Sequence, residues 1–261
     1  MLDYDAVTVA RLDRLYSTPP IVDQRRRLRA VVAAASGEAG LDIGCGAGHL
    51  ACELAREVAP GGHIVAIDRS RQSIAASTAR VAKEGLERVV DVRIGDATVL
   101  EFPDETFDFV VGAQVYSDVP DVGRAIREAA RVLRTDGRLV ILDSDWDMCV
   151  WRSSDPVLTR RMIAARGALF AHAHLPRELP ALLRAAGLTL AVAQVFSLLE
   201  TSYDPTSFGA GIIEIAREAA LKRGVTSTEV AAWEADLRSR TWDGEWFFCL
   251  NRFIFAGTKH R

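Results

Sequence analysis

Short apolar runs alternate with amphipathic stretches through the first half of the chain. Five runs have the length and composition of buried strands: residues 40–43, 63–67, 90–94, 107–112 and 137–142. Between them, three segments carry apolar side chains at helical spacing: residues 48–58, 71–84 and 121–133. Because strands that alternate with helices pack as a parallel sheet covered on both faces, the pattern predicts a doubly wound α/β fold.

The pattern changes at both ends of this region. Residues 1–35 are expected to be helical, with Pro19 and Pro20 separating a short arm from a second helix. Beyond Asp145 four segments have helical patterning: residues 156–171, 176–186, 205–223 and 226–239. Two further runs are rich in β-forming residues, 189–200 and 247–259.

Composition excludes several classes of protein. The net charge of −3 offers no basic excess for nucleic acid, so no nucleic-acid partner is expected. No apolar run reaches the ~20 residues of a membrane span, and the N-terminus lacks a secretory apolar region. The four cysteines form no C-x-x-C pair, which is typical of reduced thiols in a cytoplasmic protein.

A glycine-rich turn follows the first predicted strand, in Leu41-Asp-Ile-Gly-Cys-Gly-Ala-Gly-His49. Glycines at positions 44, 46 and 48 allow a sharp strand-to-helix turn and close approach of a ligand to the backbone. Twenty residues beyond Gly48, the second predicted strand ends on Asp68, whose carboxylate can accept hydrogen bonds from both hydroxyls of a ribose. The two features together predict a nucleoside-cofactor site.

The position of the third glycine distinguishes a dinucleotide from other nucleoside cofactors. A dinucleotide fingerprint requires glycine at position 49, where this chain has His49. The carboxylate of Asp42, two residues before Gly44, suits a ligand that carries positive charge better than a pyrophosphate. An NAD(P)-linked oxidoreductase is further disfavoured because the chain has no Tyr-x-x-x-Lys pair.

Four ordered segments carry a resemblance to a known family. They are Leu41 to Gly48, Val65-Ala-Ile-Asp68, Arg93-Ile-Gly-Asp-Ala97, and Phe107 to Gln114 followed by Arg131 to Ile141. From about Gln24 to Asp145 the chain resembles the class I S-adenosylmethionine-dependent methyltransferases, particularly the small-molecule branch that includes the quinone C-methyltransferases. The resemblance implies a mostly parallel seven-stranded sheet whose last strand is antiparallel, with an N-terminal helical arm and an inserted helical lid.

The resemblance also implies an organisation within one integrated domain. Residues 1–35 would form an arm or flap, residues 36–145 the cofactor-binding core, and residues 146–261 the lid with the last two strands. The lid helices are expected at about 146–175 and 204–240.

The implied cofactor is S-adenosylmethionine, with S-adenosylhomocysteine as product. Asp68 would bind the ribose, Asp42 would lie near the methionine ammonium group, and Tyr16 or Arg25 would reach the methionine carboxylate. The remaining expected cofactor contacts are Gly44, Gly46, Gly48, Arg69, Asp96, Ala97 and Gln114.

No motif identifies a catalytic base, because an activated sulfonium methyl needs one only when the acceptor is protonated. The candidates are His172, Tyr116 and Asp145, and the expected substrate-pocket residues are Trp146, Trp151, His174, Tyr203 and Asn251. Core packing for the tryptophans and an exposed connector for the two histidines are the competing interpretations. The i,i+2 spacing of these histidines predicts no metal site.

The expected activity is transfer of a methyl group by in-line displacement to a small, largely apolar or aromatic metabolite. Two departures from the quinone enzymes favour specialised metabolism: Asp118 stands where asparagine is usual before Val119-Pro120, and the lid is longer. The alternative is a methyltransferase-fold protein that binds the cofactor but catalyses another reaction, or only binds a ligand. A nucleic-acid methyltransferase is disfavoured because no Asn/Asp-Pro-Pro-Tyr motif follows the fourth strand. Both a monomer and a homodimer remain open.

Overall fold

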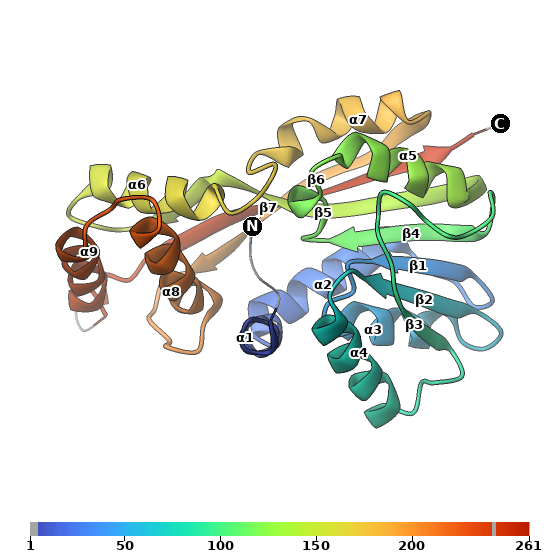
Figure 1. The fold of residues 1–261 in the computed structure, drawn as a ribbon, viewed down its shortest axis with the longest axis horizontal. Coiled ribbons are helices and arrows are strands. Elements are labelled where there is room, and N and C mark those ends of the chain that lie inside the picture. The colour runs from blue at the N-terminus through green and yellow to red at the C-terminus, as the bar shows by residue number, and fades with distance from the viewer. Residues whose placement is uncertain (1–4, 242–243, 261) are drawn as a thin grey trace.

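The computed structural model describes residues 5–241 and 244–260. Within these ranges a single seven-stranded sheet runs through the molecule in the order β3-β2-β1-β4-β5-β7-β6 (Figure 1). The strands are β1 (Ala39–Ile43), β2 (His63–Asp68), β3 (Val90–Ile94), β4 (Phe107–Ala113), β5 (Leu133–Trp151), β6 (Leu188–Glu200) and β7 (Phe248–Lys259).

The strand directions confirm the predicted fold class. Strands β1 to β5 pair in parallel, whereas β7 lies antiparallel between β5 and β6. The strand order reverses between β1 and β4, and in open α/β sheets ligands bind beside the carboxyl ends of the strands at such a switch.

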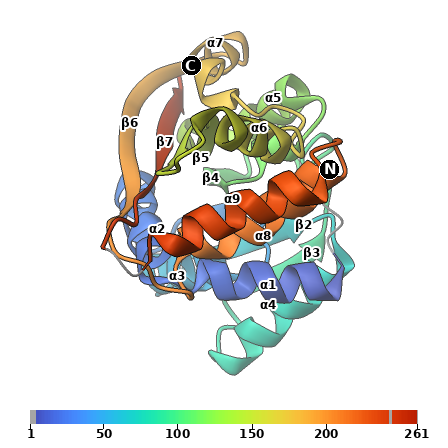
Figure 2. The ribbon, with the colours of Figure 1, turned by 90° about the vertical axis from the view of Figure 1, so that its left-hand side faces the viewer.

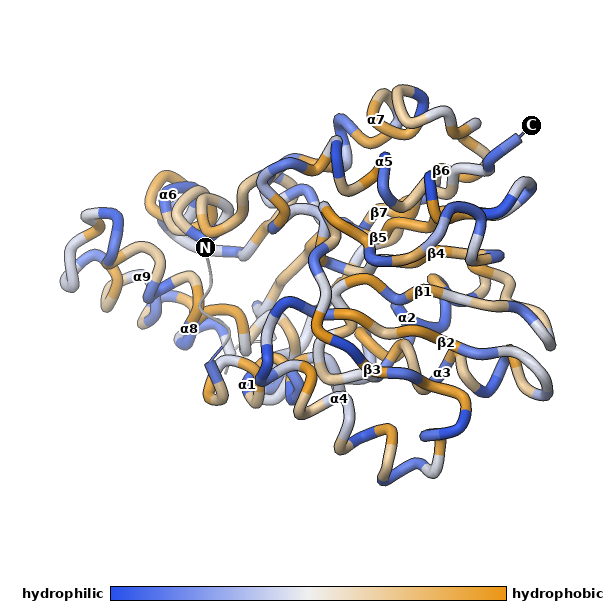
Figure 3. The backbone as a smooth tube through the Cα atoms, turned by 45° about the vertical axis from the view of Figure 1, so that its right-hand side comes forward, coloured by the Kyte–Doolittle hydropathy of each residue, from blue (hydrophilic) through white to orange (hydrophobic). Residues whose placement is uncertain are grey.

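Helices cover both faces of the sheet. On one face α5 (Val122–Val132) and α7 (Leu179–Ala185) pack on β1, β4 and β5. On the other face α2 (Pro19–Val32), α3 (His49–Val58) and α4 (Arg71–Lys83) share a second apolar cluster with the strands. In Figure 3 the strands are hydrophobic along most of their length, whereas hydrophobic and hydrophilic residues alternate along the helices. The apolar side of each helix therefore packs on the buried sheet.

The C-terminal half extends the sheet and places three helices on this extension. These are α6 (Pro156–Gly167), α8 (Phe208–Leu221) and α9 (Ser227–Ser239), which lie together at the opposite end from the C-terminus (Figures 1 and 2). They enclose a third apolar cluster with the ends of β5 and β7. We refer to α6, α8 and α9 as the lid.

The lid begins later than predicted from the sequence. A helix was expected from about residue 146, but β5 continues to Trp151 and α6 starts at Pro156. After an irregularity between Ser144 and Cys149, β5 pairs again with β7, from Cys149↔Leu250 to Trp151↔Phe248. This pairing supplies hydrogen-bond partners for the backbone N–H and C=O groups of a segment that was expected to begin the first lid helix.

The N-terminal arm connects the lid to the sheet. Helix α1 (Ala6–Tyr16) ends just before α2, whose first turn contains Pro19 and Pro20. Proline is tolerated there because the N–H groups of a first turn have no hydrogen-bond partner within the helix. Leu15 belongs to the apolar cluster of the lid, and α1 also contacts α4 beside the sheet. The arm therefore crosses the space between the two halves.

Two short 3-10 helices complete the described elements, η1 (Tyr116–Asp118) after β4 and η2 (Leu175–Arg177) before α7. None of the helices in the described ranges has the length and apolar character needed to cross a membrane.

Candidate functional site

A cavity of about 450 Å³ lies at the carboxyl ends of β1 to β4, beneath α1. Its volume falls in the range typical of small-ligand sites. The residues that follow the strands supply most of its wall, and α1 closes it from the opposite side. Its lining includes Tyr16, Gly46, Asp68, Asp96, Gln114 and Asp118.

The glycine loop forms the floor of the cavity. Gly44, Gly46 and Gly48 all have positive φ angles, +69°, +53° and +80°, which glycine adopts without a steric penalty. A Cβ atom on Gly44 would lie 2.3 Å from Val115 Cγ2, whereas one on Gly46 would meet no atom within 4 Å. Gly44 and Gly46 line the cavity, and Gly48 instead caps α3. The predicted close approach of backbone and ligand thus falls at Gly46.

The Asp68 carboxylate faces this loop from the end of β2. Its Oδ2 accepts a hydrogen bond from Gly46 N at 3.0 Å, and its Oδ1 accepts one from Ser70 N at 2.8 Å. Burial raises the pKa of Asp68, although both backbone donors oppose that shift. The carboxylate is held rigidly at the cavity wall with lone pairs left for two further donors.

Asp42 lies under the loop as a buried carboxylate that is only 2% exposed. Its Oδ2 atom has no hydrogen-bond partner among the described residues. Burial, with the nearby charges of Asp68 and Glu53, raises the pKa of Asp42 to about 8. Asp42 does not line the cavity but lies directly behind the loop. Because a cationic ligand in the cavity would favour its ionised form, the unpartnered oxygen fits the positively charged amino-acid end of the expected cofactor better than a pyrophosphate.

Asp96, Ala97 and Arg69 line the end of the cavity beside β2 and β3. Oδ1 of Asp96 accepts hydrogen bonds from Thr98 N and Thr98 Oγ1, both at 2.7 Å. These bonds lower the pKa of Asp96 and keep it ionised as an acceptor. The resemblance expects these residues to contact the adenine, and that assignment stays a prediction.

Gln114 and Tyr16 also line the cavity, on the side that faces the lid. Gln114 has a φ angle of +60°, so the chain turns sharply at the end of β4. Arg25 does not line the cavity. Its Nη1 donates to the Tyr16 carbonyl oxygen at 2.6 Å and its Nε to Glu53 Oε1 at 2.9 Å, so it holds the end of α1 in place.

The three candidate bases lie outside the cavity wall. Tyr116 is fully buried in the apolar cluster under α5, and burial raises its pKa. His172 Nε2 lies 3.1 Å from the carbonyl oxygen of Pro120, which does line the cavity. Its imidazole therefore lies behind the wall and does not line it.

Asp145 belongs to an ion-pair network. Its buried carboxylate accepts from Arg177 Nε at 2.5 Å and lies 3.0 Å from His174 Nδ1. Burial alone would raise the pKa of Asp145, but these partners hold it below its ordinary value. Asp145, Asp147 and His174 bring three possible metal ligands within 4.8 Å of one another, yet Arg177 bonds to both carboxylates.

The expected substrate-pocket residues lie on β5, on β7 and in loops, outside the lid helices, and none lines the cavity. Trp146 stacks on Phe170 with ring centroids 5.2 Å apart, in the apolar cluster of the lid. Trp151 packs edge-on against Trp233 in the lid core. Tyr203 contacts Trp246, and Asn251 bonds to Ser197 on the neighbouring strand.

Other residues at the site were not predicted from the sequence. Val9, Leu12 and Asp13 of α1 line the cavity, and the amphipathic pattern of residues 6–16 was the signal available for them. Arg166 and Arg252 are buried at the lid side. No sequence motif marks either arginine, since only the packing of α6 and β7 removes them from water.

Comparisons with known proteins identify the family of the chain. Residues 34–187 match the sequence family described as a methyltransferase domain. The chain is 35% identical over 108 residues to a demethylmenaquinone methyltransferase from Halalkalibacterium halodurans, covering 41% of this chain and 44% of the relative. It is 40% identical over 119 residues to a phosphatidylethanolamine N-methyltransferase from Cereibacter sphaeroides, covering 46% and 56%.

A solved structure shares the fold at lower identity. It is phosphoethanolamine N-methyltransferase 2 from Haemonchus contortus, bound to phosphomonomethylethanolamine and S-adenosylhomocysteine, with a TM-score of 0.64 and 19% identity. The match covers 99% of this chain and 58% of that one. The chain spans about half the length of the curated relatives it matches. Because the family match covers more than half of its residues, the chain belongs to the methyltransferase-domain family.

Proposed function

We propose that the protein transfers the methyl group of S-adenosylmethionine to a small-molecule acceptor. The observation that carries this proposal is the pair of carboxylates around the glycine loop: Asp68 is held at the cavity wall by the backbone of Gly46, and Asp42 is buried with an unpartnered oxygen. One suits a ribose and the other a cationic amino-acid end. The names of the relatives, and the ligand bound in the related solved structure, support the same cofactor.

When bound, the cofactor supplies a methyl group already activated for displacement. The protein's part is then to position the two reactants and exclude water. Gly46 would let the backbone approach the cofactor, Asp68 would orient the ribose, and Asp96 with Arg69 would frame the adenine. Tyr16 and Gln114 would form the boundary between the cofactor and the acceptor. His172, Tyr116 and Asp145 remain hypotheses as proton acceptors, and their packing favours supporting roles.

The acceptor side of the cavity supports an apolar or aromatic substrate. Leu12, Val115 and Val119 line the cavity, and the stacked pair of Trp146 and Phe170 lies at the lid. The extended lid favours specialised metabolism over a housekeeping quinone reaction. The competing proposal is a protein that binds the cofactor at the same site but does not methylate. The two proposals differ only in whether S-adenosylmethionine is converted to S-adenosylhomocysteine.

Calorimetric titration with S-adenosylmethionine, S-adenosylhomocysteine and NADPH in parallel tests the cofactor. We expect the first two to bind and NADPH not to bind. Asp68→Ala should weaken binding of S-adenosylhomocysteine by about 1–3 kcal/mol, because the variant leaves buried donors without an acceptor. Asp91→Ala, which removes an exposed carboxylate of β3, is the matched control and should bind normally. Unchanged affinity of Asp68→Ala would contradict the assignment of the ribose.

Release of S-adenosylhomocysteine during incubation with a panel of phenols, naphthoquinols and amines then separates the two proposals. Acceptor-dependent release supports the methyltransferase. Tight cofactor binding with no release on any acceptor supports the non-methylating alternative.

We further propose the division into arm (1–35), core (36–145) and lid with final strands (146–261) as functional units of one domain. A reducing, cytoplasmic setting is supported by four unpaired cysteines, three of them buried. Whether the protein is a monomer or a homodimer can be measured by sedimentation.

A further inference from the structure

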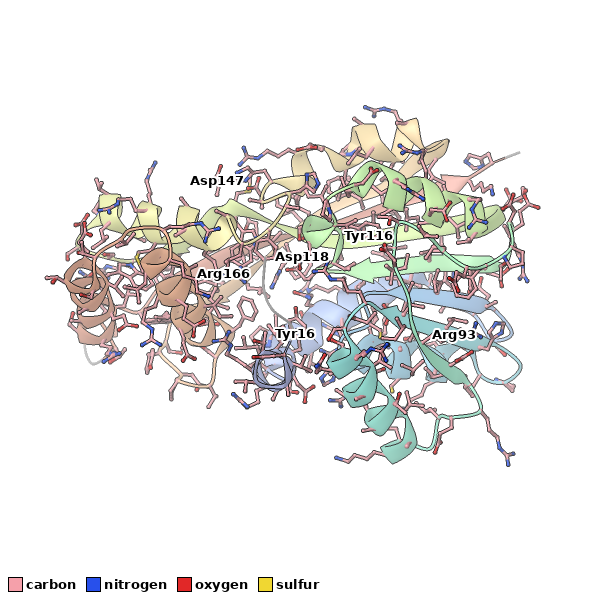
Figure 4. All side chains as sticks on the ribbon, viewed as in Figure 1. Tyr16, Arg93, Tyr116, Asp118, Asp147 and Arg166 are labelled. Carbon is pink, nitrogen blue, oxygen red and sulfur yellow. The ribbon has the colours of Figure 1, made fainter. Side chains whose placement is uncertain are left out.

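The two edges of the sheet, β3 and β6, differ in length and in charge. Strand β3 has five residues, and these include the ion pair between Asp91 and Arg93, the latter labelled in Figure 4. Short length and charged side chains are the usual means by which an edge strand avoids pairing with another chain. Strand β6 has thirteen residues, and from Leu188 to Leu199 it contains no charged residue and no proline. The protection present at β3 is therefore absent at β6.

The backbone of β6 is paired on one side only. Strand β7 pairs with its inner side, no strand of the described residues pairs with its outer side, and β6 runs along the outer margin of the molecule in Figure 2. A register shift between Leu190 and Val192 interrupts the ladder, so residues 192–200 form its regular part. Arg27 of α2 lies over one face of this part, 5.4 Å from the ring centroid of Phe196. The outward N–H and C=O groups of residues 192–200 are a template for a further strand.

Exposed apolar side chains lie on the face of the sheet opposite the lid, next to this edge. Val195 and Leu199 of β6 are 58% and 56% exposed, and Met148 of β5 is 40% exposed. Hydrogen bonds of Asn251 on β7 connect the two strands, because its side chain accepts from Ser197 Oγ at 2.7 Å and donates to Met148 Sδ at 3.6 Å. An exposed apolar patch of this kind is typical of an interaction surface.

The charges at the two ends of β6 favour a second copy of this chain as the occupant of the edge. At the start of the strand, Lys259 pairs with Leu188, and Arg184 is exposed on the helix that precedes β6. Beyond the other end of the strand, Asp204 is exposed. When two identical strands pair antiparallel, the basic end of each lies beside the acidic end of the other. The uncharged middle of β6 brings no like charges together.

We propose that the protein forms a homodimer in which the β6 edges of two copies pair antiparallel and join the two sheets into one. The arrangement is closed by two-fold symmetry, because each copy uses its unprotected edge and keeps the charged edge β3 free. Residues 192–200 have their midpoint at Phe196. Pairing about that point brings the two Val195 side chains to within about 8 Å of each other as diagonal neighbours. The inference concerns assembly and does not depend on the identity of the cofactor.

Sedimentation equilibrium of the full chain over a series of concentrations tests the dimer. We expect the wild type to show twice the mass of one chain of 28.5 kDa. Val195→Lys should raise the dissociation constant of the dimer about tenfold or more, because it places two like charges side by side across the strand pair. Val157→Lys, the same substitution at a valine of α6 that is 69% exposed, is the matched control and should sediment as the wild type.

Mixing two variants separates loss of the strand pair from loss of folding. Val195→Lys and Val195→Glu should each dissociate alone, whereas an equimolar mixture should recover the dimer, because a lysine of one copy then lies beside a glutamate of the other. Circular dichroism checks that each variant is folded. A wild type that sediments as one chain at every concentration would overturn the proposal and leave the edge for a strand of a different protein. Folded variants whose mixture stays monomeric would contradict β6 as the interface.

Hydrogen exchange locates the interface in the wild type. Amides of residues 192–200 should exchange more slowly in the wild type than in Val195→Lys at a concentration where the wild type is dimeric, since half of an edge strand's N–H groups gain a partner on pairing. The amides of β3 provide the internal comparison and should exchange equally in both proteins. A wild-type dimer with equal exchange of residues 192–200 in both proteins would place the interface elsewhere and contradict the proposal. No residue of β6 lines the cavity, so Val195→Lys should bind S-adenosylhomocysteine as the wild type does.

Discussion

The imidazole Nε2 of His49 lies 2.6 Å from Oδ1 of Asp13, and this contact joins the start of α3 to the helix that covers the cavity. Arg80 of α4 donates to the same carboxylate oxygen at 2.8 Å. Burial and the charge of Arg80 hold the pKa of His49 below its ordinary value, so near neutral pH the imidazole is uncharged and donates to Asp13. The residue that replaces the third glycine of a dinucleotide fingerprint therefore anchors α1.

Removing this anchor should loosen α1 over the cavity. We expect Asp13→Ala to speed the release of tritium-labelled S-adenosylmethionine about two- to fivefold, in line with a partly exposed ion pair of below ~1 kcal/mol. Displacement by unlabelled S-adenosylhomocysteine measures the rate. Asp23→Ala, which removes an equally exposed carboxylate on α2, away from the cavity lining, is the control and should release at the wild-type rate. Equal release rates in all three proteins would show that α1 does not gate the cavity.

Two glycines of the loop should respond differently to alanine. In Gly48→Ala the new Cβ would lie 2.5 Å from Ser77 Oγ and 3.1 Å from Ser77 Cα, so we expect unfolding to become easier by about 1–3 kcal/mol. In Gly46→Ala the Cβ meets open space, and only the left-handed backbone costs about 1 kcal/mol. That Cβ would instead occupy space needed by the cofactor.

Chemical denaturation and calorimetry on the two variants provide the check. Gly46→Ala should lose more cofactor affinity than Gly48→Ala, while Gly48→Ala should lose more stability. The reverse ranking would place the close approach of the cofactor elsewhere on the loop.

Asp42 should make the cofactor-free protein less stable as the pH rises. Its pKa is raised from 3.8 to about 8 by burial, so the folded state keeps a proton that the unfolded chain releases. Its contribution to stability is therefore complete at low pH, falls as the pH rises between these two values, and is constant above about 8.

Asp42→Asn should flatten this part of the pH profile, which thermal unfolding monitored by circular dichroism can measure. Saturating S-adenosylhomocysteine should also reduce the slope in the wild type, because its ammonium group favours the ionised carboxylate. Asp91→Asn, an exposed position, serves as the control. A variant whose profile matches the wild type would mean that Asp42 is ionised in the folded protein.

We expect Asp145 to contribute to the stability of the fold and not to catalysis. The folded-state pKa is lowered, so its contribution to stability is present above the ordinary value of 3.8 and is lost as the pH falls toward the folded-state value. At neutral pH we expect Asp145→Asn to reduce the free energy of unfolding by about 1–3 kcal/mol through weaker hydrogen bonds from Arg177 and His174.

A double-mutant cycle with Arg177→Met distinguishes the two roles. If the carboxylate acts through Arg177, the combined loss of stability is smaller than the sum of the single losses. Turnover measured well below the unfolding temperature should remain near the wild-type rate. Loss of turnover with unchanged stability would restore Asp145 as a candidate base.

Local patterns were sufficient to predict most of the fold. The strands at 189–200 and 247–259 were predicted within one residue of β6 and β7 at every boundary, because both runs combine β-forming residues with clear turn signals. The extension of β5 to Trp151 was not predicted. Residues 149–151 extend the strand only because β7 pairs with them from a distance of about one hundred residues in sequence.

The candidate site divides in the same way. The glycine loop, Asp42 and Asp68 could be predicted from the sequence because their spacing along one strand-helix-strand unit, β1-α3-β2, already determines their geometry. Tyr16 was expected at the site from the resemblance, whereas Arg166 and Arg252 were not, since only the packing of α6 and β7 removes them from water. An arginine in a sequence is by default a solvated residue, and burial among aromatic rings is decided by the tertiary structure alone.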